Sequence, residues 1–510
     1  MKQRCWFLLT LFLFSTPIVR AGDWYSWRGP EQNGVSRETD LPSKFSEDPK
    51  EEGSNLVWKA PYGTRSTPIV MNGRVYFINQ SGEKINEQER VICLDEKTGE
   101  KIWERRFNVF HTDIVSVRLG WGNLAGDPKT EKLYWHGTQG LFVCFDKDGK
   151  ILWSKSMTEE FGRVSGYGGR VNSPTIDGDL VILGMPNFSW GDQAAGAIRY
   201  FGMNKHNGEV LWTWQSPNKV KDSFYSNPVI AVINGQRLLI TGGGDGYLHA
   251  LKVRNGEHVW SYRITDGGLN TSPVVEGNRV FITHGAENFG TGLQGGVFCV
   301  DASEVKDGQP KLVWKRYNVI AKYTSPIVKD GRLYVCTDIA RMECLDTKTG
   351  QRIWRRPLAY GRNAKGSPVL ADGKIYVGAV DAEFSIIDPS GTRPKVLHRQ
   401  FFRSPDGIVA IEINGTPAVA NGRVFFGTSE AFYCIGKKEW GGKAGEIPPM
   451  PEEAPLGKPA SVRIEPSEVT IHPGDTDEIT VSGMDENVRL LETNTPSGEW
   501  SIPTPTTPPK

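Results

Sequence analysis

Excess charge of either sign is missing from this 510-residue sequence, which holds 60 lysines and arginines against 59 aspartates and glutamates and has a net charge of +1. Proteins that bind nucleic acids or membrane surfaces usually carry a basic patch, so neither class is indicated. Long apolar runs are missing as well, and no transmembrane span is expected in the mature chain. The sequence therefore predicts a globular protein whose partners are neither nucleic acids nor lipid bilayers.

Cysteines are few, seven in all, and no Cys-x-x-Cys, adjacent pair or haem-attachment motif occurs. Five occupy one repeated position between apolar residues, which favours small buried side chains, because equivalent positions in separate repeats lie too far apart to bridge. These five are Cys93, Cys144, Cys299, Cys344 and Cys434. Cys336 can face Cys344 only across a hairpin, so at most one disulfide is compatible with the repeat.

The first 21 residues predict a secretory signal. Lys2 and Arg4 provide a positive start, residues 5–14 form an apolar run too short to span a bilayer, and a small-x-small motif ends at Ala21. We expect cleavage near Ala21 and a mature protein that is periplasmic or secreted. The alternative is an N-terminal anchor that is never cleaved. Cys5 stands at the start of the apolar run, where no lipid-modified cysteine would sit.

Glycine (58), proline (32) and tryptophan (16) are plentiful, a mixture typical of β-rich proteins with many turns. A four-strand unit recurs along the chain, as from Ser325 to Trp354. It begins with a polar residue before proline, passes an Asx-Gly turn suited to a two-residue hairpin, and closes on tryptophan after a Thr-Gly turn. The prolines that begin the units are Pro68, Pro174, Pro228, Pro273, Pro326, Pro368 and Pro417.

Seven tryptophans close these units at separations of 40 to 59 residues, the length of a four-stranded blade. They are Trp58, Trp103, Trp153, Trp212, Trp260, Trp314 and Trp354. Two degenerate copies, 119–153 and 367–398, bring the count to eight. Trp58 precedes the first full unit, and the last unit has only three strands, so residues 55–58 are expected to complete it and close the ring. The prediction is an all-β, eight-bladed β-propeller over residues 55–436.

The recurring pattern apolar-Asp-x-x-Thr-Gly-x-x-x-Trp, present from Leu94 to Trp103 and from Leu345 to Trp354, resembles the tryptophan-docking repeat of the PQQ-repeat propellers. This family includes quinoprotein alcohol dehydrogenases and BamB. The resemblance covers about residues 55–436. It implies that each closing tryptophan wedges against the neighbouring blade.

The same resemblance raises the question of a cofactor. The dehydrogenases use pyrroloquinoline quinone (PQQ), usually Ca²⁺ and a base, and alcohol-oxidising members place two adjacent cysteines over the quinone. Adjacent cysteines are missing here, and Glu287 with Asn288 is the nearest cluster to a Ca²⁺ site. PQQ and Ca²⁺ thus follow from the family resemblance alone, because a fold does not settle a function.

Outside the ring, three segments are distinguished by composition. Residues 22–54 form an N-terminal extension, and residues 437–459 have the Lys, Glu, Gly and Pro content of a linker. Residues 460–510 resemble the opening strands of a short immunoglobulin-like β module with a disordered end. At about half the usual size, this module lacks the length for a full core.

Long, varied connections are expected on one face of the ring, and long loops on a rigid scaffold are where binding usually occurs. Residues before the inner strands should line the mouth of the central channel. The candidate ligand-binding residues are Arg65, His111, Arg118, Arg163, Tyr167, Arg170, Asn270, His284, Glu287, Tyr323, Asp338, Lys365 and Asp381. A cationic funnel for an anionic ligand is expected from Arg65, Arg118, Arg170 and Lys365. The alternative for each residue is a hydrogen bond or ion pair that orders its loop.

Two functions remain open. The first is a non-catalytic, monomeric scaffold that binds a protein, glycan or other envelope component through the long-loop face. The second is a dehydrogenase dependent on PQQ and Ca²⁺. No catalytic residue is indicated by the sequence, and reduction of an artificial electron acceptor after incubation with quinone and Ca²⁺ separates the two.

Overall fold

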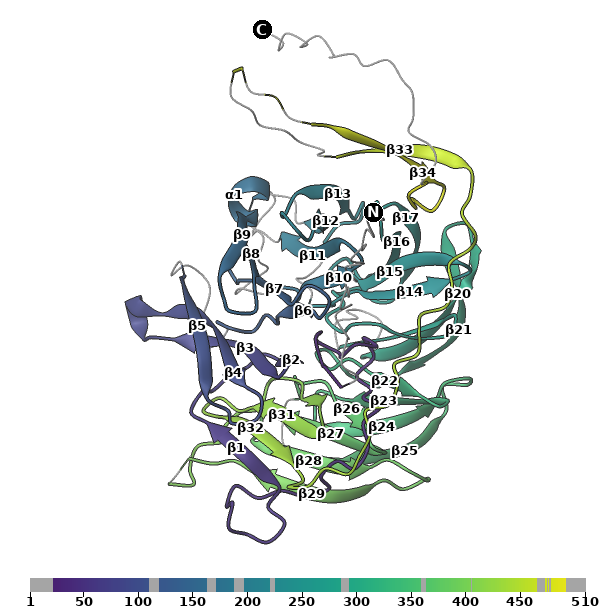
Figure 1. Cartoon of the computed structure of the whole chain (residues 1–510). Helices are drawn as coiled ribbons and strands as arrows, with labels where there is room; N and C mark the ends of the chain where they lie inside the picture. The colour runs from purple at the N-terminus through teal and green to yellow at the C-terminus, as the bar shows by residue number, and fades with distance from the viewer. Residues whose placement is uncertain are drawn as a thin grey trace, which may run out of the picture.

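Eight four-stranded antiparallel sheets follow one another around a ring (Figure 1), so the predicted eight-bladed β-propeller is confirmed. The computed structural model describes residues 22–109, 119–162, 171–187, 197–220, 225–285, 293–358, 364–404, 406–465, 473–474, 476 and 478–491. Helix in these ranges is limited to α1 (Met157–Phe161) and the 3-10 turn η1 (Lys84–Asn86). The predicted secretory signal lies outside the described residues, and no described helix has the length and apolar character needed to cross a membrane.

Each blade runs from an inner strand at the channel to an outer strand. The first four blades consist of β2 (Ile69–Met71), β3 (Arg74–Ser81), β4 (Gln88–Asp95) and β5 (Lys101–Asn108); β6 (Ala125–Asp127), β7 (Lys132–His136), β8 (Leu141–Phe145) and β9 (Ile151–Ser156); β10 (Thr175–Asp177), β11 (Leu180–Asn187), β12 (Ala197–Asn204) and β13 (Val210–Gln215); and β14 (Val229–Ile233), β15 (Gln236–Gly242), β16 (Tyr247–Lys252) and β17 (His258–Arg263).

The remaining blades consist of β18 (Val274–Glu276), β19 (Arg279–His284), β20 (Gly296–Lys306) and β21 (Gln309–Tyr317); β22 (Ile327–Lys329), β23 (Arg332–Cys336), β24 (Arg341–Asp346) and β25 (Arg352–Pro357); β26 (Val369–Ala371), β27 (Lys374–Ala379), β28 (Glu383–Asp388) and β29 (Lys395–Phe401); and β30 (Ala418–Ala420), β31 (Arg423–Gly427) and β32 (Phe432–Gly436) with β1 (Leu56–Ala60).

The ring closes through β1, which pairs antiparallel with β32 as predicted. Trp58 lies opposite Cys434 in this pair, and its Nε1–H donates to the carbonyl of Glu96 in the first blade at 3.0 Å. Pairing the two ends of the chain within one blade leaves no exposed sheet edge at the junction.

The closing tryptophans dock against the next blade. A Cβ placed on Gly99 would lie 2.6 Å from the Trp58 ring, so only glycine permits the contact. The same pairing of ring and glycine recurs four times, as Trp103 with Gly149, Trp153 with Gly208, Trp212 with Gly256 and Trp314 with Gly350. Trp260 and Trp354 are buried without such a glycine. The docking implied by the family resemblance is confirmed at five blades.

The Asx-Gly turns adopt the predicted hairpin geometry at five of six positions. Asn72 and Gly73 have φ angles of +53° and +78°, as a type I′ turn requires. The pair Asp177-Gly178 differs because Asp177 is paired with Leu180, which makes Gly178, with φ +57°, the first central residue of the turn. A glycine at that place suits the related type II′ turn.

The cysteines are small core side chains, as predicted. Each of the five repeated cysteines lies opposite the closing tryptophan of its blade. All six described cysteines are buried and free. Cys336 faces Met342 and Cys344 faces Tyr334, so the register prevents the one disulfide that the sequence left open.

A closed ring of hydrogen bonds joins the eight blades at the start of their inner strands. In each blade the polar residue at this place contacts its counterpart in the next blade; seven of the eight contacts run from a backbone N–H to a side-chain oxygen, and one from an amide to a hydroxyl, at 2.6 to 3.1 Å. The members in order are Thr67, Asn123, Ser173, Asn227, Ser272, Ser325, Ser367 and Thr416. This belt explains why a small polar side chain precedes proline in nearly every unit.

The N-terminal extension closes the channel on the short-turn face, and it lies over the middle of the ring in purple (Figure 1). Trp24 forms a bridge with Val70 of the first blade, and Val35 forms one with Leu370 of the seventh. Between them, the buried guanidinium of Arg28 donates to the carbonyls of Ser325 at 2.9 Å and Pro326 at 2.6 Å. The extension thus crosses the ring and binds the inner strands of blades on both sides.

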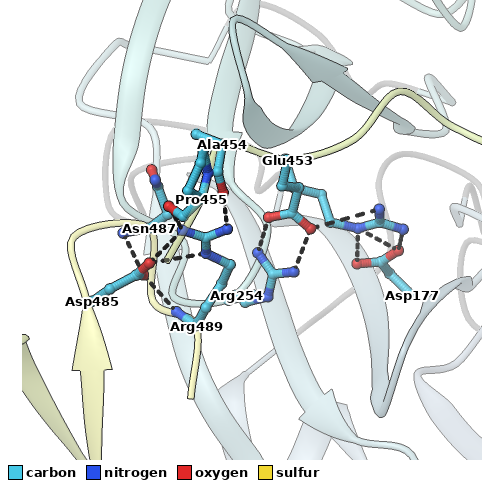
Figure 2. A network of polar contacts seen from close by, with 9 residues as sticks. Asp177, Arg254, Glu453, Ala454, Pro455, Asp485, Asn487 and Arg489 are labelled. Atoms are coloured by element: carbon cyan, nitrogen blue, oxygen red, sulfur yellow. Dashed lines mark hydrogen bonds and ion pairs between the residues drawn. The ribbon is translucent and has the colours of Figure 1, made fainter. Parts of the chain in front are cut away.

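The linker follows the same face as an extended chain. It passes Thr39 and Arg37 of the extension, with Thr39 N–H donating to Lys443 O at 3.1 Å, and reaches the fourth blade at Ala454, whose N–H donates to Gly235 O at 3.0 Å. Glu453 there binds Arg254 through two hydrogen bonds of 2.6 and 2.8 Å (Figure 2). The linker is therefore docked on the propeller rather than a free spacer.

Beyond the linker, the described residues of the C-terminal module form one two-stranded sheet, β33 (Pro459–Glu465) and β34 (Thr480–Asp485). Arg489 joins this sheet to the linker by donating to Asp485 and to the carbonyls of Ala454 and Pro455 (Figure 2). Burial alone would raise the pKa of Asp485, but hydrogen bonds from Arg489 and nearby backbone amides lower it to about 2. The predicted immunoglobulin-like fold stays a prediction, since a two-stranded sheet does not test it.

Candidate functional site

A funnel opens at the centre of the long-loop face, and each blade contributes one residue to its wall. That residue stands two positions before the polar residue of the hydrogen-bonded belt, so the repeat itself aims eight side chains at one point. They are Arg65, Trp121, Val171, Tyr225, Asn270, Tyr323, Lys365 and Asn414, and they line a hollow of about 100 Å³.

The structure brings four of the predicted site residues together here: Arg65, Asn270, Tyr323 and Lys365. Trp121, Val171, Tyr225 and Asn414 complete the wall and were not among the candidate ligand-binding residues. The positional rule that placed the other residues finds Trp121 and Asn414 when it is applied to the degenerate second unit and to the last unit.

Two cations lie in the funnel. Arg65 Nη2 has Glu412 Oε2 as its charged neighbour at 3.5 Å, a long contact, and Asn414 donates to the same oxygen at 2.9 Å. Lys365 Nζ lies 5.0 Å from the centroid of the Trp121 ring, a cation–π distance. No acidic side chain is among the described residues of the funnel wall.

The funnel also holds amides without partners. Asn270 is 4% exposed, and neither its Nδ2 nor its Oδ1 has a hydrogen-bond partner in the described chain. Asn414, 8% exposed, likewise leaves Oδ1 unpaired. A buried amide without a partner costs free energy, so such groups mark a place for a ligand or ordered water.

The floor of the funnel is built by the N-terminal extension. Trp27 lines the funnel from below and also a second hollow of about 270 Å³ between the extension and the blades. Beside it, Tyr225 lies between Trp121 and Tyr323, with ring centroids 6.4 and 6.3 Å apart. Aromatic side chains therefore lie on the side of the funnel that faces the N-terminal extension.

Three other predicted site residues lie outside the funnel wall. His284 is buried on β19 with Nδ1 bonded to Gly285 O at 2.9 Å, and burial lowers its pKa to about 4. Asp338 accepts from the N–H of Lys322 at 2.7 Å, which orders its loop. Asp381 lies exposed in the turn between β27 and β28. The remaining candidates, His111, Arg118, Arg163, Tyr167, Arg170 and Glu287, lie outside the described residues.

The described residues do not fit a Ca²⁺-bound quinone. Ca²⁺ takes six to eight oxygen ligands that include carboxylates, whereas the described funnel wall offers amides and hydroxyls beside two cations. No group of three or more His, Cys, Asp or Glu in the described ranges is placed to hold a metal ion. The hollow of about 100 Å³ is also smaller than the 300 to 1,000 Å³ usual for sites of cofactor size.

Comparison with known proteins finds relatives of two kinds, BamB proteins and quinoprotein alcohol dehydrogenases. A family model described as outer membrane protein assembly factor BamB matches residues 87–356, just over half of the chain. BamB of Shewanella oneidensis is 22% identical over 64% of this chain and 75% of its own length. Quinohemoprotein alcohol dehydrogenase of Comamonas testosteroni is 32% identical, but the match covers 27% of this chain and a fifth (20%) of the dehydrogenase.

Solved structures agree on the fold. The crystal structure of BamB from Moraxella catarrhalis has a TM-score of 0.53 at 14% identity and covers 75% of this chain and 99% of its own. At this identity the likeness supports the propeller and not a shared activity.

Proposed function

Because the chain belongs to the PQQ-repeat propeller family whose model is described as outer membrane protein assembly factor BamB, we propose that it is an exported, non-catalytic scaffold of the cell envelope. It binds an anionic group of a protein, glycan or other envelope component through the long-loop face. The observation that carries the proposal is the funnel wall, where cations and unpaired amides from separate blades converge.

The electrostatics favour an anionic ligand. Arg65 and Lys365 come from the first and seventh blades, on either side of the eighth, and both line the funnel. The contact of Arg65 with Glu412 is too long for a strong hydrogen bond. A carboxylate or sulfate between the two cations gains charge-assisted hydrogen bonds, which are about twice as strong as neutral ones. The Asn270 amide supplies a further donor and an acceptor.

The size of the funnel favours one protruding acidic group over a large cofactor. About 100 Å³ accommodates a single acidic group at the end of a larger molecule. A scaffold needs no more than this, because the surrounding loops of a rigid ring supply the rest of an interface. The name outer membrane protein assembly factor, which the BamB relatives carry, agrees with a binding role.

The test is binding of an envelope extract to the immobilised mature protein. Lys365→Glu reverses one funnel charge, and Arg263→Glu is the matched control, since Arg263 is a 59% exposed cation at the long-loop end of β17, outside the funnel. We expect the Lys365 variant to lose the main bound component and the Arg263 variant to retain it. Equal retention by both variants contradicts the proposal.

The dehydrogenase alternative is tested on the same protein. Incubation with PQQ and Ca²⁺, followed by an alcohol and an artificial electron acceptor, detects quinone-dependent oxidation. We expect no saturable quinone binding and no dye reduction. Turnover that depends on added quinone would show that the protein is a dehydrogenase and would contradict the proposal of a non-catalytic scaffold.

A further inference from the structure

A third hollow, which we call the arginine cleft, lies beside the funnel on the same face. It has a volume of about 370 Å³ and is lined by Arg65, Arg90, Arg106, Asn79, Gln80 and Ser81, among others. Arg65 lines both hollows, so the two are neighbours on this face. None of the sequence patterns had marked Arg90 or Arg106.

The cleft places like charges face to face. Arg90 on β4 is directly opposite Arg106 on β5, and Asn79 on β3 is opposite Arg90. Like charges at directly opposed positions destabilise a sheet. A fold that keeps such a pair at the edge of a depression gives up stability there, as functional sites commonly do.

The acids near the cleft do not neutralise it. Glu104 is the one carboxylate shared by Arg106 at 2.6 Å, Lys101 at 3.0 Å and Arg90 at 3.6 Å. The last distance exceeds a hydrogen bond. Three cations thus share one anion on this strand pair, and Arg65 adds a fourth cation whose acid, Glu412, is 3.5 Å away.

Hydrogen-bond donors in the cleft also lack acceptors. Arg90 donates from Nε to Asn79 Oδ1 at 3.0 Å and lies 5.5 Å from the centroid of the Tyr62 ring, which fixes its guanidinium. Its terminal nitrogens have no hydrogen-bonded acceptor in the described chain. Ser81 is 8% exposed, and its Oγ has no partner. A guanidinium carries five N–H donors, so a ligand with several acceptor oxygens can accept from the donors of Arg90 that have no acceptor in the protein.

We infer that the funnel and the arginine cleft together bind an acidic oligosaccharide, with one carboxylate between Arg65 and Lys365 and a second at Arg90 and Arg106. The inference rests on the proposed function and specifies its ligand. The amide and hydroxyl side chains that line the cleft match sugar hydroxyls. An acidic peptide would bring apolar side chains, for which the described cleft offers only Pro61, Leu119 and the ring of Tyr62.

The probe is a fluorescently labelled tetragalacturonate, and binding to the mature protein is followed by anisotropy. Arg90→Gln tests the cleft, Lys365→Gln tests the funnel, and Arg263→Gln is the control cation on the same face. Losing one charge-assisted contact weakens binding by about tenfold or more. We expect this loss for the first two variants, and no change for the third.

Two further probes distinguish ligand length and class. Monomeric galacturonate has a single carboxylate, and we expect it to bind in the funnel alone. Its weak binding should therefore fall with Lys365→Gln and be unchanged with Arg90→Gln. A labelled octaglutamate tests the peptide alternative and should bind at least tenfold more weakly than the tetragalacturonate.

Three outcomes overturn the inference: no binding of tetragalacturonate, equal affinity for Arg90→Gln and Arg263→Gln, or tighter binding of octaglutamate. The proposed function fails separately, when the Lys365 variant keeps its envelope component. Unfolding temperatures of all variants establish that each loss is one of binding and not of folding.

Discussion

The two faces of the ring differ in how some of their charged and polar groups are paired. On the short-turn face, the N-terminal extension and the linker dock on the blades, and two cations there are paired at short distance: Lys205 with Asp127 at 2.8 Å in a buried pair, and Arg254 with Glu453 at 2.6 Å (Figure 2). On the long-loop face, Arg90 opposes another arginine and Asn270 has no partner. Paired charges mark where the chain holds itself together, and groups left without partners mark where it is built to hold something else.

The largest expected loss of stability concerns the short-turn face, where the N-terminal extension docks. Arg28→Ala removes a buried guanidinium that donates to Ser325 and Pro326 carbonyls and leaves both acceptors and a cavity behind. Since hydrogen bonds to charged groups contribute about 1.5 to 3 kcal/mol each, we expect a loss of at least about 3 kcal/mol of stability. Guanidinium unfolding monitored by tryptophan fluorescence measures it.

The control for that change is Arg263→Ala on the opposite face, an exposed cation whose removal should alter stability by less than about 0.5 kcal/mol. If the two variants unfold at the same denaturant concentration, the extension does not stabilise the ring. The contrast between the faces would then be one of geometry alone.

A pH prediction concerns two imidazoles buried at the long-loop ends of β7 and β19. Burial lowers the pKa of both His136 and His284 to about 4, from an ordinary value of 6.5. The unfolded chain therefore binds more protons than the native chain between these values, so stability is full above pH 6.5 and falls as the pH decreases toward 4. Each histidine should lower the free energy of unfolding by about 2 kcal/mol between pH 7 and pH 5.

The variant His136→Phe cannot be protonated, and its stability should depend less steeply on pH across this window. His206→Gln is the control, because His206 is half exposed in a turn of the opposite face. Unfolding curves at pH 5, 6 and 7 provide the comparison. A slope that His136→Phe leaves unchanged would place the acid sensitivity elsewhere.

A smaller effect is expected where the linker docks. Glu453→Gln removes the anion that binds Arg254 in two short hydrogen bonds, and hydrogen bonding to Arg254 is the main reason that the pKa of Glu453 lies below its usual range. Because these side chains are partly exposed, we expect about 1 kcal/mol of docking free energy to be lost. Limited proteolysis of the linker should accelerate by about fivefold.

Glu446→Gln, at an exposed position of the same linker, provides the control. If both variants are cleaved at the wild-type rate, the network in Figure 2 does not hold the linker in solution. The C-terminal sheet would then be tethered to the ring rather than fixed on it.

The propeller could be predicted from the sequence because every blade repeats the same four-strand pattern. Trp58 before the first unit and the three-stranded last unit predicted the closure, and equivalent positions before the inner strands predicted Arg65, Asn270, Tyr323 and Lys365. The repeat is informative because one residue at a given offset occupies one place in space, eight times over.

What the repeat does not contain was not predicted. Trp27 and Arg28 belong to an irregular extension without periodicity, and their binding to blades hundreds of residues away depends on long-range contacts that no local pattern encodes. Arg90 and Arg106 were missed because they lie on strands, whereas binding residues were sought in loops. The available signal for Arg90 was the polar run Gln88-Glu89-Arg90 at the start of β4. Arg106 had no such signal, because β25 likewise carries arginines after its closing tryptophan.

The smallest expected change in stability is an increase, whereas the other variants are expected to lose stability or binding. It concerns a single position on the long-loop face. Arg106→Thr relieves the repulsion with Arg90 and introduces a residue that favours strands, so stability should rise by about 0.5 kcal/mol. Its neighbour Arg105 points to the next blade and donates from Nε to Gly149 O at 2.7 Å, so Arg105→Thr should instead lower stability by about 1 kcal/mol. Thermal unfolding of the two variants measures both signs. If Arg106→Thr is also destabilising, Arg106 serves the fold, and the long-loop face loses its distinction at that position.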